Sequence, residues 1–149
     1  MTTEAFKLIS LNVRGISNFR KRRAIFTWCL KRKADFMFLQ PTHSKKDTEI
    51  YWKNKWGAEA VMSHGSSNSC GVAILFRKVV DFVIHTKILD PLGPYIILKA
   101  AIKEKIYILI NIYAPNKDKD ISRFFNNLFI MLQNENLDEE NIIVGGHFN

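Results

Sequence analysis

Cysteine is scarce in this sequence. The 149 residues contain only Cys29 and Cys70, and neither stands in a CxxC pair or at zinc-site spacing from a histidine. Two isolated thiols give no basis for a disulfide framework and suit a reducing compartment. Because Cys29 falls in a helical pattern and Cys70 opens a strand pattern, we expect both to be small buried hydrophobes.

Long apolar runs are also missing. No stretch approaches the 18 or so apolar residues of a membrane span, and the opening Met1-Thr2-Thr3-Glu4 lacks the layout of a secretory signal. There is no internal repeat or linker, while eleven phenylalanines and three tryptophans argue against disorder. We therefore expect one intracellular domain over residues 1–149, not secreted and without a membrane partner.

Acidic residues are few in the first part of the chain. Residues 1–60 hold 13 of the 22 lysines and arginines but only five of the 14 acids, which accounts for the whole net charge of +8. A positive field confined to one part of a fold favours a polyanionic partner. The alternative is a solvated surface that happens to be rich in lysine and arginine.

Hydrophobic periodicity predicts alternating strands and helices. Strand patterns cover residues 6–13, 36–39, 70–76, 81–88, 95–102, 106–113 and 142–144. Helical patterns run from Ser17 or Asn18 to about Lys33, from Asp47 through Lys55, and from Asp120 to Leu132. Residues 64–69 are expected to form a polar turn, and residues 103–105 to connect a hairpin. This order predicts an α/β fold with a mixed sheet.

Two features within the helical patterns have competing interpretations. Trp52 and Trp56 lie four positions apart and are interpreted as packing residues in preference to a base-stacking platform. The run Arg20-Lys21-Arg22-Arg23 is compatible with a nuclear localisation signal, but a solvated helix face is the favoured interpretation.

Polar residues gather where the predicted buried strands end. Ligand sites of α/β proteins lie at such ends, so these residues are candidates for one shared pocket. The competing interpretation is four unrelated turns, because Asn, Pro and Gly favour turns anyway. The strand-end residues are Asn12, Gln40-Pro41-Thr42-His43, Asn111, Tyr113, and Gly145-Gly146-His147-Phe148-Asn149.

Five runs in consistent order carry a resemblance to a known family. They are LISLNVRGI, DFMFLQPTHS, GVAILF, INIYAPN and IIVGGHFN. Together they resemble the endonuclease/exonuclease/phosphatase superfamily, most closely its branch of LINE-type retrotransposon and apurinic endonucleases. The resemblance implies a β-sandwich of two sheets flanked by helices, Mg²⁺-dependent hydrolysis of phosphodiesters, a DNA substrate, and a parent polyprotein with a reverse transcriptase. A nuclear location is then expected if the protein is functional.

The resemblance also implies which residues form the site. Asn12 matches the family's active-site asparagine, Tyr113 matches a tyrosine that contacts the scissile phosphate, and Asn149 matches an asparagine that orients phosphate and nucleophile. Pro41 stands where the family has its metal-binding glutamate, and His147 stands where it has a catalytic aspartate. Proline cannot hold Mg²⁺ through its side chain, and histidine suits Zn²⁺ or Ni²⁺ better.

His147 can also be interpreted as a general base, although a structural histidine is favoured. A further departure is length, because the family's second half would contribute the other sheet and a late Asp-His pair. We therefore expect an incomplete, truncated sandwich with one uncovered apolar sheet face.

These features lead to a reading of function with one main alternative. The chain resembles a Mg²⁺-dependent DNA endonuclease of a non-LTR retrotransposon, in a degenerate and inactive copy. The alternative is a non-catalytic remnant that binds nucleic acid, and an inert fragment or a phosphatase of the same superfamily are further possibilities. The residues predicted to bind nucleic acid are Arg14, Arg20, Arg22, Lys31 and Arg32.

Overall fold

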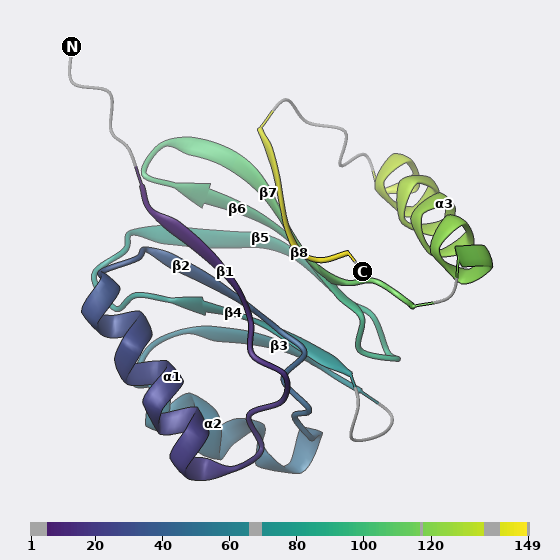
Figure 1. Ribbon diagram of the computed structural model, residues 1–149. Coiled ribbons are helices and arrows are strands. Elements are labelled where there is room, and N and C mark those ends of the chain that lie inside the picture. The colour runs from purple at the N-terminus through teal and green to yellow at the C-terminus, as the bar shows by residue number, and fades with distance from the viewer. Residues whose placement is uncertain (1–5, 66–69, 117, 136–140, 149) are drawn as a thin grey trace.

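The computed structural model describes residues 6–65, 70–116, 118–135 and 141–148 (Figure 1). Within these residues, two four-stranded sheets pack against each other and three α-helices cover their outer faces. The helices are α1 (Phe19–Arg32), α2 (Glu49–Trp56), which follows a short 3-10 helix at Lys46–Thr48, and α3 (Asp118–Asn134). The strands are β1 (Leu8–Asn12), β2 (Phe36–Gln40), β3 (Ala60–His64), β4 (Gly71–Phe76), β5 (Phe82–Leu89), β6 (Tyr95–Ile102), β7 (Lys105–Tyr113) and β8 (Ile142–His147).

Both sheets are mixed. The first has the order β1-β2-β4-β3, with β1 parallel to β2 and the other pairs antiparallel. The second has the order β5-β6-β7-β8, with only β7 and β8 parallel among the described strands. Strands β1, β2 and β3 therefore run in one direction, as do β5, β7 and β8. The predicted α/β class with a mixed sheet is confirmed.

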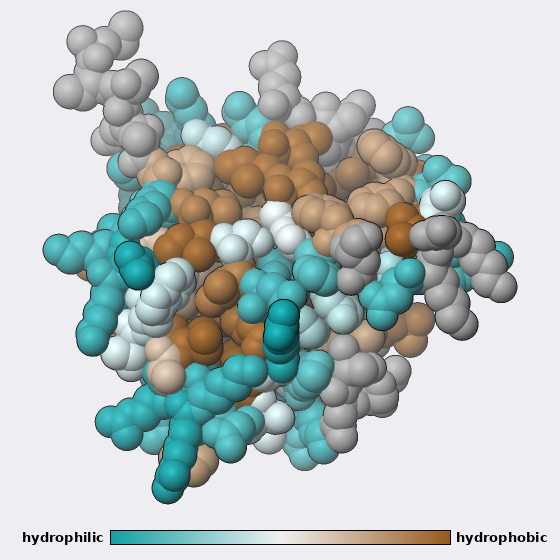
Figure 2. Space-filling model, viewed as in Figure 1, coloured by the Kyte–Doolittle hydropathy of each residue, from teal (hydrophilic) through white to brown (hydrophobic). Residues whose placement is uncertain are grey.

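The expectation of an uncovered sheet face is wrong for the described residues. The inner faces of the two sheets bury each other, because the chain up to β8 already supplies both sheets of the sandwich. What stays exposed is the outer face of the edge strand β8, where Ile142 and Val144 are 41% and 49% exposed while Ile143 packs against the inner core. In Figure 2 hydrophobic colour spreads over the β1 and β8 side of the molecule. The inner layer includes Phe36, Phe38, Ile74 and Phe76 from the first sheet and Ile96, Leu98, Ala100 and Ile102 from the second.

Helices fill the outer layers. α1 and α2 cover the first sheet, and α3 covers the second (Figure 1). Trp52 and Trp56 are each 5% exposed, and the Trp56 indole donates to the Phe76 carbonyl at 2.9 Å, which confirms their packing role. Cys29 is buried as predicted, and burial raises the pKa of its thiol to about 11. Cys70 is only half-buried.

One side chain caps the N-terminus of α1. Asn18 precedes the helix, and its Oδ1 accepts from the backbone N–H groups of Arg20 and Lys21 at 3.0 and 3.1 Å. These bonds satisfy two of the donors that a helix start leaves unpaired, so the predicted cap is confirmed. Among the described helices, none combines the length and apolar character that a membrane crossing requires.

One strand was missing from the sequence prediction. β3 pairs antiparallel with β4 and is buried from Ala60 to Ser63. A strand buried on both faces shows no alternation of polar and apolar residues. The four buried residues of this short strand therefore carry no periodic signal. The strand ends at His64, where a turn was expected, and most of that turn (66–69) lies outside the described residues.

Candidate functional site

Four strands bring their carboxyl ends to one edge of the sandwich. In the parallel β1–β2 pair Asn12 lies opposite Gln40, and in the parallel β7–β8 pair Tyr113 lies opposite His147. The two pairs meet because the amide of Asn12 and Nδ1 of His147 are 3.3 Å apart. The predicted convergence of these strand ends is therefore seen in the fold.

Asn12, His147 and Tyr113 lie at the centre of this edge. Together with Pro41, these residues are called the strand-end site. Oδ1 of Asn12 accepts the backbone N–H of Arg14 at 3.2 Å. The NH₂ group of Asn12 therefore faces His147 and donates to Nδ1. The Tyr113 and His147 rings stack with centroids 5.7 Å apart and planes 19° apart. An amide, an imidazole and a phenol thus lie together, and all three can hydrogen-bond an oxyanion.

Pro41 lies at the end of β2, where the resemblance places a metal-binding glutamate. The residue is buried, and its carbonyl accepts the Gly15 N–H at 2.8 Å. Gly15 has φ +80, and a Cβ there would overlap the His43 ring. The loop after β1 therefore packs tightly on the loop after β2. Pro41 contributes shape to the strand-end site but no side-chain donor or acceptor.

A buried amide pair lies beneath the site. Gln40 Nε2 donates to Asn111 Oδ1 at 3.1 Å and to Ser10 Oγ at 3.0 Å. Asn111 Nδ2 donates to the carbonyls of Ala73 and Leu39 at 2.8 and 3.2 Å. Gln40 is 1% exposed and Asn111 is fully buried. The sequence placed both at strand ends; the structure shows that they join the two sheets and do not line the site.

The donor set of the strand-end site does not fit Mg²⁺. This ion takes oxygen ligands and is usually bound through one or two carboxylates. Asn12, Tyr113, His147 and Pro41 bring no carboxylate, and no cluster of three or more His, Cys, Asp or Glu side chains occurs in the described part of the chain. Asn149, the remaining predicted site residue, lies outside the described residues.

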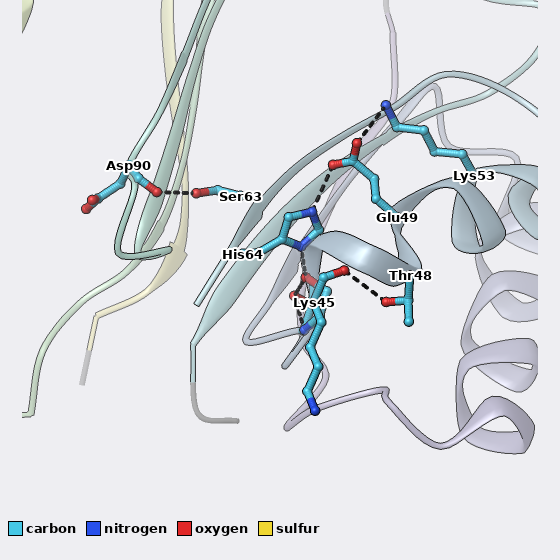
Figure 3. A network of polar contacts seen from close by, with 9 residues as sticks. Lys45, Thr48, Glu49, Lys53, Ser63, His64 and Asp90 are labelled. Atoms are coloured by element: carbon cyan, nitrogen blue, oxygen red, sulfur yellow. Dashed lines mark hydrogen bonds and ion pairs between the residues drawn. The ribbon is translucent and has the colours of Figure 1, made fainter. Parts of the chain in front are cut away.

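A second polar network fixes the loop that follows Pro41. His64, at the end of β3, has Nδ1 2.7 Å from Ser44 Oγ and Nε2 2.8 Å from Glu49 Oε1 (Figure 3). Ser44 is 1% exposed, which makes it a structural hydroxyl and not an accessible nucleophile. Sequence reasoning missed this network, because its members come from separate elements and share no motif.

The network lines one wall of an open hollow of about 540 Å³ between the loop before α2 and the turn after β5. Lys45 and Lys46 are exposed on its rim. Since β2 and β3 run in the same direction, this hollow lies along the same edge as the strand-end site. The two lysines extend the positive charge of that edge beyond Arg14, and the sequence analysis had not singled them out.

The predicted nucleic-acid-binding residues divide into three groups. Arg14 is exposed in the loop after β1, beside Asn12. Arg20, Lys31 and Arg32 are exposed along α1. Basic residues are therefore present at the edge and along a helix, and the two surfaces adjoin at the start of α1, where Lys21 Nζ donates to the Arg14 carbonyl at 3.4 Å.

Arg22 differs from the other predicted nucleic-acid-binding residues, because its guanidinium is largely buried and engaged inside the fold. It is 5% exposed and points toward the sheet with Phe26 and Cys29, the other buried positions of α1. Its Nη1 donates to the carbonyls of Ile16 and Ser17 at 3.1 and 3.0 Å, and its guanidinium lies 4.6 Å from the Trp52 ring centroid. Burial lowers the pKa of Arg22.

Comparison with known proteins gives one sequence relative and several solved structures. No protein-family model matches the chain. The "Transposon TX1 uncharacterized 149 kDa protein" of Xenopus laevis is 27% identical over 147 residues. The match covers 97% of this chain and 11% of the relative, so the chain spans about a tenth of that protein.

The solved structures share the fold at low sequence identity. The endonuclease domain of TRAS1, a telomere-specific non-LTR retrotransposon, has a TM-score of 0.64 at 14% identity, over 95% of this chain and 58% of that one. D. rerio TDP2 complexed with a single-strand DNA product has a TM-score of 0.64 at 17% identity, over 93% and 58%. A mannosyl-6-phosphatase of Bacteroides thetaiotaomicron has a TM-score of 0.73 at 13% identity, over 97% and 66%. The chain spans less than two thirds of each.

Proposed function

We propose that this chain, which has the fold of the endonuclease/exonuclease/phosphatase superfamily, is part of a non-LTR retrotransposon endonuclease domain whose strand-end site binds DNA without cleaving it. The similarity to a transposon protein and to the TRAS1 endonuclease domain supports the retrotransposon origin. The parent protein would then be a polyprotein with a reverse transcriptase, acting on DNA in the nucleus.

The observation that carries the proposal is the chemistry of the strand-end site. Asn12, Tyr113 and His147 offer hydrogen bonds to a phosphate, and Arg14 adds a charge beside them. Hydrolysis in this family needs a metal held in place and a water made nucleophilic. Pro41 and His147 remove the two acids that the resemblance assigns to these tasks, so recognition is retained while the reaction loses its electrostatic support.

DNA is favoured over a phosphorylated sugar as the ligand. The likeness to the mannosyl-6-phosphatase is one of fold, at 13% identity. The positive charge beside the site, with Arg14, Lys45 and Lys46 exposed along one edge, suits a polymer of phosphates better than a single phosphate. The complex of a fold neighbour with single-strand DNA also supports this choice.

Binding of labelled duplex DNA by fluorescence anisotropy tests the proposal. Asn12→Ala and Tyr113→Ala should each weaken binding several-fold, because each removes a group that faces the phosphate. Asn126→Ala, an exposed asparagine on α3, is the matched control and should leave the affinity unchanged. Equal affinities for all four proteins would show that DNA does not use the strand-end site.

A further inference from the structure

The exposed side of α1 carries a second surface. An open region of the α1 surface lined by Arg20, Trp28 and Lys31 adjoins a hollow of about 500 Å³ between α1 and α2, whose inner wall includes Arg22 and Phe26. Phe19, Arg23 and Thr27 line both, so the open region and the hollow are continuous. We call the two together the α1–α2 groove; its principal residues are Phe19, Arg20, Arg23, Trp28, Lys31 and Tyr51.

Exposed aromatic rings and cations alternate in this groove. Phe19 and Trp28 on α1 and Tyr51 on α2 are 58%, 36% and 50% exposed, although large rings are usually mostly buried. Each has a cation near its ring: Arg20 at 5.8 Å from Phe19, Arg32 at 4.9 Å from Trp28, and Lys55 at 5.4 Å from Tyr51. No acidic side chain lines the groove.

Helix stability does not explain these cations. Arg20, Lys21 and Arg23 are exposed in the first turns of α1, and the first turn holds no acidic residue. The partial positive charge of a helix start makes cations there unfavourable. A solvated helix face would place them near the helix end, where only Lys31 and Arg32 stand. Lys21 donates to the Arg14 carbonyl at 3.4 Å and Arg20 lies over the Phe19 ring, but the positive charge that accumulates at the start of α1 would be further stabilised by an anionic ligand.

We propose that the α1–α2 groove binds single-stranded nucleic acid. Phosphates would pair with Arg20, Arg23 and Lys31, and unpaired bases would stack on Trp28 and Tyr51. Flat rings beside cations match the alternation of base and phosphate, which is how strands without sequence preference are held. α1 is about 20 Å long, enough for roughly four nucleotides. A duplex hides its base faces and cannot use the rings.

The groove is independent of the strand-end site, because the two share no residue and α1 lies over the outer face of the first sheet. Figure 2 shows hydrophilic side chains gathered over the α1 region at the lower left. The groove begins near Asn18, close to the end of β1, and runs toward Arg32, whose carbonyl accepts the Lys7 ammonium at 2.8 Å. A single strand held here would thus lead away from the strand-end edge.

The test measures anisotropy with two fluorescein-labelled probes, a twelve-nucleotide oligo-dT and a duplex of the same length. Trp28→Ala should weaken binding of the single strand about tenfold, since one stacked base is lost, and change duplex binding little. Phe129→Ala, which removes a 63% exposed ring on α3, is the aromatic control and should have no effect.

Charge is tested with Arg23→Gln/Lys31→Gln. For the single strand, the slope of log affinity against log salt should fall by about 1.4, since each phosphate contact contributes about 0.7. Lys78→Gln/Lys87→Gln removes two exposed charges next to and on β5 and is the matched control. Its slope should stay close to that of the unaltered chain. Thermal melts of all variants check that the fold is intact.

Three outcomes would overturn the proposal. The first is equal loss of affinity in Trp28→Ala and Phe129→Ala. The second is an unchanged salt slope in Arg23→Gln/Lys31→Gln. The third is stronger competition by poly-glutamate or by anionic phospholipid vesicles than by unlabelled oligo-dT. Loss of single-strand binding in Asn12→Ala, with none in Trp28→Ala, would instead place the strand at the strand-end site and leave the proposed function standing.

Discussion

Replacing Asn111 with leucine tests whether the buried amide pair holds the two sheets together. The side chain is fully buried and takes part in three hydrogen bonds: it donates to the carbonyls of Ala73 and Leu39 and accepts from Gln40. Leucine is close in size and makes none of them. A buried group left without its partner costs about 1–3 kcal/mol. Three groups lose a partner, and at the lower end of this range for each of them we expect a loss of roughly 3–4 kcal/mol in all.

Urea unfolding followed by circular dichroism measures this loss. The midpoint should fall with an unchanged slope, which separates lost stability from a changed unfolded state. In a chain of this size the melting temperature should drop by roughly 10 °C. Asn54→Leu, at an exposed position of α2, is the control and should shift the free energy of unfolding by less than about 0.5 kcal/mol. A loss below about 1 kcal/mol for Asn111→Leu would refute the structural role assigned to the pair.

Two further predictions concern buried groups of α1. Arg22→Gln should destabilise the fold by about 2–3 kcal/mol in urea melts, because two charge-assisted bonds to the Ile16 and Ser17 carbonyls are lost; Arg23→Gln, at an exposed position, should not. The Cys29 thiol has a pKa of about 11, so only about one in a thousand molecules is a thiolate at pH 8. Iodoacetamide should therefore leave Cys29 unmodified at pH 8, with labelling rising as the pH approaches 11; rapid labelling at pH 8 in peptide maps would contradict its burial.

The sequence allowed most elements of the fold to be predicted, because strands and helices here follow clear periods. Seven of the eight described strands lie where alternation or short apolar runs placed them. β3 was not predicted, because it is buried on both faces and its sequence shows no alternation. The pairing of strands into sheets could not be predicted from the sequence, since it depends on contacts between distant segments. The resemblance implied that the family's second half supplies the other sheet, and the structure shows instead that the described residues form both sheets.

The candidate site was predicted in outline, because motif order places Asn12, Tyr113 and His147 at strand ends that meet. Side-chain direction was less accessible. Arg22 belongs to a run of four cations, and only its place on the inner side of α1 shows that it is structural. The bonds of His64 to Ser44 and Glu49 join three elements and leave no local pattern in the sequence.

A plasmid-nicking assay in Mg²⁺ tests most directly the claim that the site binds DNA without cleaving it. Three proteins are compared: the chain as it stands, Pro41→Glu/His147→Asp, and that double variant extended by the second half of a related endonuclease domain. We expect no nicking from the first two, because restored acids still lack the rest of the domain that the longer fold neighbours possess, and nicking from the third. Metal-dependent nicking by the unaltered chain that is lost in Asn149→Ala would contradict the account.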